Sequence, residues 1–238
     1  MRRVHSSVVA AAIALLPALA AAQGGAAQAG DASRAVSGGG IMVAGWQGRI
    51  DASEAARGGT IQQTKLAKEG DAIRITTGPA AAFWQPTNTA SGTYTVKATF
   101  HEPEFMNVNT HAHPYGVFIG GNDMGTDNQS YLYCAAYGNG NFIVRGFGPA
   151  AFQLNGRAGE ANAAVHKAEA KGKEVTQEVA INVLADKVEC AINGTVVASY
   201  PKADLVAAGK LKSTDGIYGI RFAHNTDAHV IGLTMTKK

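Results

Sequence analysis

The stretch between Tyr115 and Gly148 constrains the fold more than any other part of the chain. It contains three short runs rich in aromatic and β-branched residues, separated by Gly, Asn and Asp. This composition is typical of consecutive antiparallel strands. The stretch therefore predicts a β-sheet protein, and no catalytic, phosphate-binding or dinucleotide-binding pattern accompanies it.

Further strand-like segments follow along the chain, with almost no helix between them. Gly92–Phe100 alternates as a half-buried strand does, and Asn193-Gly194 predicts a type I′ hairpin turn within the three strands of Gln177–Val197. Ala158–Lys173 has no apolar stripe, so we expect a surface loop there. About a dozen short strands predict a sandwich or barrel. Other strands are expected at Ile41–Trp46, Ala72–Thr76 and Ala82–Gln85, and in a closing hairpin of Ile217–His224 with His229–Thr236.

The N-terminus has the features of an export signal. Two arginines precede the apolar run Val8–Leu19, and Ala20–Ala22 offers small residues for cleavage. The apolar run is shorter than the roughly 20 residues that a membrane-spanning helix needs. We therefore expect residues 1–22 to be a signal peptide. The mature protein is then periplasmic or secreted, without membrane attachment.

The charge of the mature chain argues against nucleic acid as a partner. The whole chain has 21 Lys+Arg and 18 Asp+Glu, or +3, and removing Arg2 and Arg3 leaves 19 against 18, or +1. Nucleic-acid binding needs a clustered basic surface, which this balance does not predict. Residues 23–40 are small, polar and Gly-rich, so we expect a flexible linker before a single β-sandwich domain at 41–238.

The two cysteines leave one structural question open. Cys134 and Cys190 each lie in a strand-like run, and no CxxC or Cys/His zinc pattern surrounds them. An exported protein meets an oxidising compartment, where a disulfide persists. Two buried thiols acting as small apolar side chains are the alternative.

The register of the central hairpin follows from the way its side chains segregate. A three-residue loop at 138–140 places Tyr133 opposite Arg145 and Tyr131 opposite Phe147. The thiol of Cys134 then shares the other, apolar face, whereas a register slip of one residue would bury Arg145. This register predicts an aromatic outer face that carries an arginine. Such a face suits stacking on sugar rings, although cross-strand aromatic pairs under a covering loop would look the same.

Four segments resemble one known superfamily in their order and pattern. They are GVFIGG, SYLYCAAYGNGNFIVRGFG, QEVAINVLADKVECAINGTVVASYP and GIYGIRFAHNTDAHVIGLTM. Together they resemble the concanavalin A-like lectin/glucanase superfamily, in particular its secreted bacterial branch. The resemblance implies an all-β fold, a jelly-roll β-sandwich of two antiparallel sheets. It implies no single function, because the superfamily contains lectins, hydrolases, lyases and adhesion modules.

The catalytic patterns of that superfamily are missing from this chain. Its retaining glucanases carry Glu-x-Asp-x-Glu on one strand, and the nearest feature here is Glu102-Pro103-Glu104, which we interpret as a solvated turn. The chain is also distantly similar to 3-keto-disaccharide hydrolase domains, but it lacks their Asn-Ser-Gly-Ile motif. We therefore lean against an enzyme and assign no catalytic residue.

Two segments contain side chains that bind metals in other proteins. His111-Ala112-His113 places two imidazoles two residues apart, but Pro114 indicates a loop. Further imidazoles occur at His101, His224 and His229, and no sequence argument brings them to this pair. The oxygen-rich loop 122–128 is the one segment that suits calcium, yet its residues are ordinary turn formers. We assign no cofactor and no metal ligand, with calcium at the loop as the alternative.

Three functions remain open at this point. The first is an exported, non-catalytic module that binds a glycan or a cell surface through Tyr131, Tyr133, Arg145 and Phe147, together with Tyr115 and Trp84. The second is a glycoside hydrolase or lyase in the same groove, with candidates Glu102, Glu104, Asp123, Asp127 and His113. The third is a periplasmic structural or protein-interaction domain. The exposure of the Tyr131 face distinguishes the first function from the third.

Overall fold

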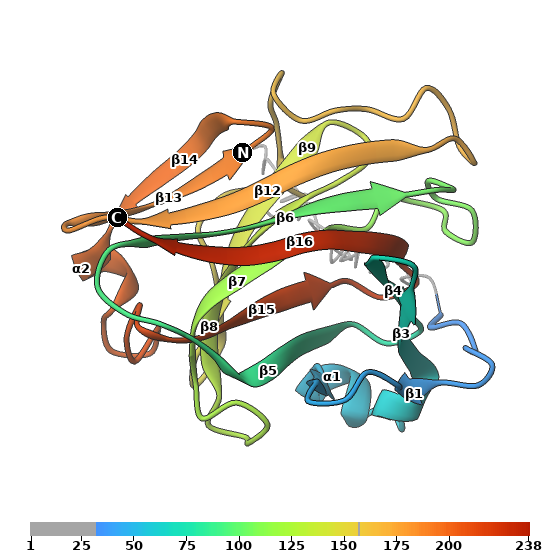
Figure 1. Cartoon of the computed structure of the whole chain (residues 1–238), viewed down its shortest axis with the longest axis horizontal. Coiled ribbons are helices and arrows are strands. Elements are labelled where there is room, and N and C mark those ends of the chain that lie inside the picture. Colours follow the sequence, from blue (N-terminus) through green and yellow to red (C-terminus); the bar gives the residue numbers. More distant parts are fainter. Residues whose placement is uncertain (1–31, 157) are drawn as a thin grey trace, which may run out of the picture. The chain divides into compact units, whose positions relative to one another are not determined.

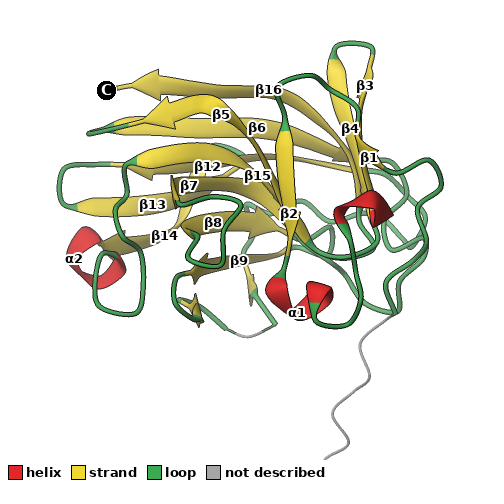
Figure 2. Cartoon of the chain, turned by 90° about the horizontal axis from the view of Figure 1, so that it is seen from below, coloured by secondary structure: helices red, strands yellow, loops and turns green. Residues whose placement is uncertain are grey.

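Two β-sheets lie against each other in the computed structural model, which describes residues 32–156 and 158–238. Figure 1 and Figure 2 show the two sheets as layers with few helices around them. The predicted signal peptide and residues 23–31 of the predicted linker lie outside the described residues. The helices of the described residues are all too short and too polar to cross a membrane.

The first layer, named here the β6 sheet, has eight strands. Their order is β1 (Gly40–Ile41), β3 (Thr64–Glu69), β4 (Ala72–Thr77), β16 (Asp227–Lys237), β6 (Tyr94–Glu102), β12 (Val175–Val183), β13 (Lys187–Ile192) and β14 (Thr195–Pro201). Neighbouring strands are antiparallel except for the short β1–β3 pair.

The second layer, named here the β8 sheet, is antiparallel throughout. Its order is β10 (Ala151–Gln153), β9 (Asn141–Phe147), β8 (Ser130–Ala136), β7 (Tyr115–Asn122), β15 (Gly216–Phe222), β5 (Ala81–Ala90) and β2 (Gln47–Ile50), with β11 (Glu160–Ala161) also paired to β9. The helices are α1 (Ala52–Ala55), a 3₁₀ turn at Ile61–Gln63 and α2 (Lys202–Leu205).

The core between the sheets follows from the two-residue period of the strands. On β6 the apolar residues at every second position, Tyr94 to Phe100, are fully buried, as their alternation predicted. On β8 and β9 the inward residues are Leu132, Cys134, Ala136, Phe142 and Val144. The all-β sandwich of two antiparallel sheets is therefore confirmed.

The central hairpin has the predicted register. Tyr133 lies opposite Arg145 and Tyr131 opposite Phe147, and the Tyr137 amide donates a 2.8 Å hydrogen bond to the Asn141 carbonyl. The second predicted turn is also confirmed. Asn193 and Gly194 both have positive φ, at 49° and 81°, as a type I′ turn requires.

The question about the cysteines is answered by the structure. Cys134 on β8 and Cys190 on β13 form a disulfide that joins the two sheets across the core. Both residues are almost fully buried. The bridge closes a chain separation of 56 residues.

Several boundaries differ from the sequence-based expectations. The closing hairpin is wrong, because β15 belongs to the β8 sheet and β16 to the β6 sheet. No strand covers Ile41–Trp46; β1 ends at Ile41 and β2 begins at Gln47. The end of the predicted linker is part of the fold, since Arg34 donates hydrogen bonds of 2.9 Å to the carbonyls of Thr77 and Thr226. Ala158–Lys173 is mostly loop, as expected, with only the short β11 inside it.

Candidate functional site

The outer face of the β8 sheet carries the aromatic residues that the hairpin register predicted. We call this group the aromatic cluster: Ala82, Trp84, Phe118, Tyr131, Tyr133, Ala135, Tyr137 and Ile143. Its rings contact one another closely; the centroids of Tyr131 and Phe118 are 5.0 Å apart, as are those of Tyr131 and Phe147. The sequence thus identified the correct face of the hairpin.

Most of these rings are covered, which corrects the expected binding surface. Tyr131, Tyr133 and Trp84 are exposed by only 0%, 5% and 2%. The loops that precede β7 and β8 contribute to the cover, through Ala112 and Met124. None of the three rings forms a surface on which a sugar ring can stack.

Tyr115 corrects the prediction in another way. It points into the core between the sheets, where its ring centroid lies 5.4 Å from that of Phe100 and 6.0 Å from that of Phe222. The outward neighbour on β7 is Gly116, opposite Ala135. Tyr115 is therefore a core residue and takes no part in the outer face.

An arginine that the sequence analysis did not select lies within the aromatic cluster. The guanidinium carbon of Arg221 on β15 is 5.6 Å from the ring centroid of Tyr133 and 5.5 Å from that of Phe147. Its Nη2 atom donates a 2.6 Å hydrogen bond to Oδ2 of Asp51. Burial lowers the pKa of Arg221, but Asp51, Tyr131 and Tyr133 together raise it by more, so the pKa lies above its ordinary value. The buried side chain is thus held as a cation, with Asp51 as its ion-pair partner.

Arg145 and Phe147 are the two predicted residues that stay partly exposed. They line a pocket of about 420 Å³, named here the Arg145 pocket. The guanidinium of Arg145 lies 5.4 Å from the ring centroid of Phe147. The other polar side chains around the pocket are Arg49, Asp51, Ser53, Thr126, Asp127 and Gln129.

The charges of the Arg145 pocket are incompletely paired. Arg49 forms an ion pair with Asp127, and Asp51 forms one with Arg221. Among residues 32–156 and 158–238, no carboxylate pairs with Arg145. In the same part of the chain, Nε of Arg145 and Nη1 of Arg49 are buried donors without a hydrogen-bond partner. Buried donors are normally satisfied, so these two favour a ligand that accepts hydrogen bonds.

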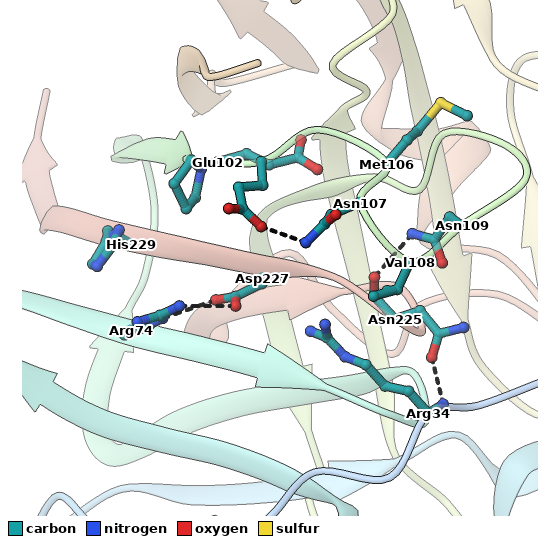
Figure 3. A pocket seen from close by; sticks show the side chains of 12 residues that line it. Arg34, Arg74, Glu102, Met106, Asn107, Val108, Asn109, Asn225, Asp227 and His229 are labelled. Carbon is teal, nitrogen blue, oxygen red and sulfur yellow. Dashed lines mark hydrogen bonds and ion pairs between the residues drawn. The ribbon is translucent and has the colours of Figure 1, made fainter. Parts of the chain in front are cut away.

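A second, smaller pocket of about 240 Å³ lies at one end of β4, β6 and β16 and is named here the Glu102 pocket (Figure 3). It is polar, and Arg74 binds both carboxylate oxygens of Asp227 there, at 3.0 and 3.1 Å. Glu104 also lines this pocket and accepts a hydrogen bond from the Asn107 amide. Two of the acids proposed from the sequence therefore meet in one cavity.

Glu102 is buried, contrary to the solvated turn expected for Glu102-Pro103-Glu104. It is the last residue of β6 and continues the inward row that ends at Phe100, so only 6% of it is exposed. Burial raises the pKa of Glu102 to about 7. Its Oε2 atom forms no hydrogen bond within the described residues, and the nearby Tyr115 hydroxyl and Met106 backbone offset the rise in pKa only in part. The alternation of buried residues along β6, continued by two residues beyond Phe100, would have predicted that the Glu102 side chain points between the sheets.

The other acids considered for catalysis lie on the surface. Asp123 forms an ion pair with Lys212, and Asp127 forms one with Arg49. Both belong to the oxygen-rich loop 122–128, and within the described residues neither joins a group of three or more metal-ligating side chains. Those contacts are typical of a solvated turn. His113 lies elsewhere, in the connection between β6 and β7, beside two other histidines.

Comparisons with known proteins support the fold alone. No protein-family model matches the sequence, and no curated protein matches it. The chain is similar in structure to the carbohydrate-binding module CBM66 from Bacillus subtilis, with a TM-score of 0.55, 8% identity, and 83% of this chain and 99% of that chain covered. A B. subtilis protein of unknown function with a galectin-like fold gives a TM-score of 0.53, 11% identity, and 81% and 89% coverage.

A third similar structure is the exoplasmic/lumenal domain of VIP36, in its Ca²⁺- and Man2-bound form. Its TM-score is 0.51 at 9% identity, with 88% of this chain and 86% of that chain covered. These likenesses confirm the predicted fold, a jelly-roll β-sandwich of two antiparallel sheets, and extend no further than the fold. The same fold occurs in proteins of many different activities, so only the pockets of this chain indicate its function.

Proposed function

We propose that the protein is an exported, non-catalytic module that binds a glycan in the Arg145 pocket. The observation that carries this proposal is the pair of Phe147 and Arg145, a half-exposed ring beside a guanidinium with an unsatisfied donor. Similar structures named as a carbohydrate-binding module and as a Man2-bound domain support it. The disulfide supports export, because disulfides persist in oxidising compartments.

The pocket contains the groups that sugar recognition needs. Phe147 offers an apolar ring face, while Arg145 and Gln129 offer donors in the lining of the pocket. Because no carboxylate pairs with Arg145 within the described residues, a sugar that carries a carboxylate gains an ion pair that a neutral sugar does not. The proposal therefore favours uronate-containing oligosaccharides over neutral ones.

Replacing Arg145 or Phe147 with alanine is expected to weaken glycan binding at least tenfold, which corresponds to about 1.4 kcal/mol. Arg145→Ala removes the donors and the cation, and Phe147→Ala removes the stacking face. Binding is measured by a glycan array and then by calorimetry with uronate and neutral oligosaccharides of equal length. Arg145→Ala should also abolish the preference for uronates.

Arg57→Ala is the matched control, because Arg57 is an exposed arginine that does not line the pocket. The glycan affinity of Arg57→Ala should equal that of the wild type. If the wild type binds no glycan in a broad library, the result would contradict the proposal and favour a protein-interaction domain. Binding that neither Arg145→Ala nor Phe147→Ala changes would place the glycan elsewhere and also contradict it.

A second candidate function is acid–base chemistry on a sugar in the Glu102 pocket. One observation favours it: the pKa of Glu102 is raised to about 7, which suits a general acid at neutral pH. Glu104 and Asp227 are the other carboxylates in the same cavity. Glycoside hydrolysis uses such pairs, with one acid held protonated.

The Glu102→Gln variant tests this candidate through stability and through turnover. The folded-state pKa of about 7 lies above the ordinary 4.5, so the native state holds its proton more tightly than the unfolded state. The resulting stability is complete below pH 4.5 and is lost as the pH rises through 7. Between pH 4.5 and 8, the difference in unfolding free energy between wild type and variant should change by about 3 kcal/mol.

Denaturant titrations across that pH range measure the change, with Glu174→Gln, on the exposed surface, as the control. A difference independent of pH would show that Glu102 is ionised at neutral pH. Any release of reducing sugar should disappear in Glu102→Gln and persist in Glu174→Gln. Reducing-sugar release that survives in Glu102→Gln would exclude the residue as the acid.

A further inference from the structure

Three imidazoles meet in the loops that precede β7 and follow β15, and none of them lines the Arg145 pocket. His111 and His113 come from the connection between β6 and β7, and His224 comes from the connection between β15 and β16. Nε2 of His113 lies 2.9 Å from Nε2 of His111 and 3.0 Å from Nε2 of His224. One metal-binding atom from each ring lies within 4.8 Å of the others.

The orientation of the central ring is determined by a backbone carbonyl. Nδ1 of His113 is 2.6 Å from the carbonyl oxygen of His224, which only accepts hydrogen bonds. The hydrogen of a neutral His113 ring therefore lies on Nδ1, and its Nε2 presents a lone pair. An outer hydrogen bond of this kind fixes the tautomer of many metal-bound histidines.

The two connections that carry these rings are held together by hydrogen bonds to backbone carbonyls. The Ala223 amide donates a 2.9 Å hydrogen bond to the Pro114 carbonyl, and the Asn109 side chain donates one of 2.9 Å to the Asn225 carbonyl. His113 is 6% exposed, His224 is half-buried and His111 is exposed. The cluster is thus anchored on one side and open to solvent on the other.

We propose that His111, His113 and His224 bind one divalent transition-metal ion of the Zn²⁺ type through their Nε2 atoms. Imidazole nitrogens favour Zn²⁺, Cu²⁺ and Ni²⁺, whereas Ca²⁺ and Mg²⁺ require oxygen ligands, which the three rings do not offer. Tetrahedral zinc with bonds of about 2.0–2.1 Å holds its nitrogens roughly 3.4 Å apart, so small ring rotations suffice. Three protein ligands leave a fourth position on the open side for water or another ligand.

The cation also resolves the crowding of the three nitrogens. The lone pair of His113 Nε2 is approached by Nε2 of both His111 and His224. One lone pair accepts a single well-directed hydrogen, whereas a metal ion receives a lone pair from each of three rings. A shared cation therefore uses the lone pairs of all three rings at once.

Calorimetry of the chelator-treated, purified full chain with ZnCl₂ tests the proposal, and metal analysis after dialysis checks the stoichiometry. We expect one Zn²⁺ per chain. Co²⁺ should compete for the same site and give the strong visible absorption of a tetrahedral complex. CaCl₂ should give no binding at this site.

The variants separate loss of a ligand from loss of the fold. His113→Ala and His111→Ala should each weaken Zn²⁺ binding roughly 100-fold or more, beyond the 10–100-fold that outer-shell changes cost. His111 is exposed, so its variant keeps the fold, which circular dichroism verifies. His166→Ala removes an exposed histidine elsewhere and should bind Zn²⁺ as the wild type does. Absence of Zn²⁺ binding to the wild type, or binding that His111→Ala leaves unchanged, would overturn the proposal.

Discussion

Replacing Asp51 with asparagine is expected to lower the free energy of unfolding by about 3–5 kcal/mol. The change neutralises the one carboxylate that pairs with Arg221 among the described residues, and leaves the guanidinium charged with only 6% of its side chain exposed. Nη1 of Arg221 already has no hydrogen-bond partner within the described residues. Urea titrations monitored by tryptophan fluorescence measure the loss.

Two further variants identify the cause of that loss. The double variant Asp51→Asn/Arg221→Met should recover at least half of the lost stability, because replacing a buried ion pair by apolar groups costs much less than breaking it. Asp71→Asn, in the exposed turn between β3 and β4, should stay within about 0.5 kcal/mol of the wild type. An Asp51→Asn variant as stable as Asp71→Asn would show that Arg221 is stabilised by other groups.

Removing the disulfide is expected to cost about 4 kcal/mol, because the bridge closes a separation of 56 residues in the unfolded chain. For a domain of this size, that loss lowers the melting temperature by roughly 8–16 °C. The Cys134→Ala/Cys190→Ala variant, and wild type unfolded with and without reductant, provide two independent measurements. Thermal unfolding monitored by circular dichroism gives the melting temperatures.

Accessibility of the thiols is the control for this prediction. Both cysteines are almost fully buried, so a mild reductant should leave the native protein intact and act only after unfolding. An alkylating reagent added to the unfolded, unreduced chain should modify no cysteine. If the double variant has the same melting temperature as the wild type, the disulfide does not restrict the unfolded state.

In the hairpin of β8 and β9, local sequence patterns predicted the strand register but not the exposure of the side chains. Segregation of apolar side chains around Cys134 predicted the register of β8 and β9 correctly, because a shift of one residue would have buried Arg145. The same reasoning did not predict the exposure of Tyr131 and Tyr133. Loops that precede β7 and β8 cover their side of the sheet, and no periodicity within the hairpin reports such contacts.

The candidate sites depend on residues that are distant in the sequence. Arg221 reaches the aromatic cluster from β15, and its partner Asp51 follows β2, 170 residues earlier. His224 joins His113 across a separation of 111 residues. Sequence spacing showed only the His111-Ala112-His113 pair, which alone is a weak metal signal. Glu102 is different: we expected a solvated turn, but the alternation of β6, continued by two residues beyond Phe100, leads to the inner face on which it lies.

The sequence by itself determined which faces of the strands are apolar, the turn at Asn193-Gly194 and the sandwich class, because these depend on period-two alternation and on backbone preferences within a few residues. Only the tertiary structure decided that β15 and β16 enter different sheets, that Cys134 meets Cys190 and which rings stay exposed. These outcomes depend on how the two sheets and their loops pack over long separations. The same long-range packing brings together the residues of the Arg145 pocket, of the Glu102 pocket and of the three-histidine cluster.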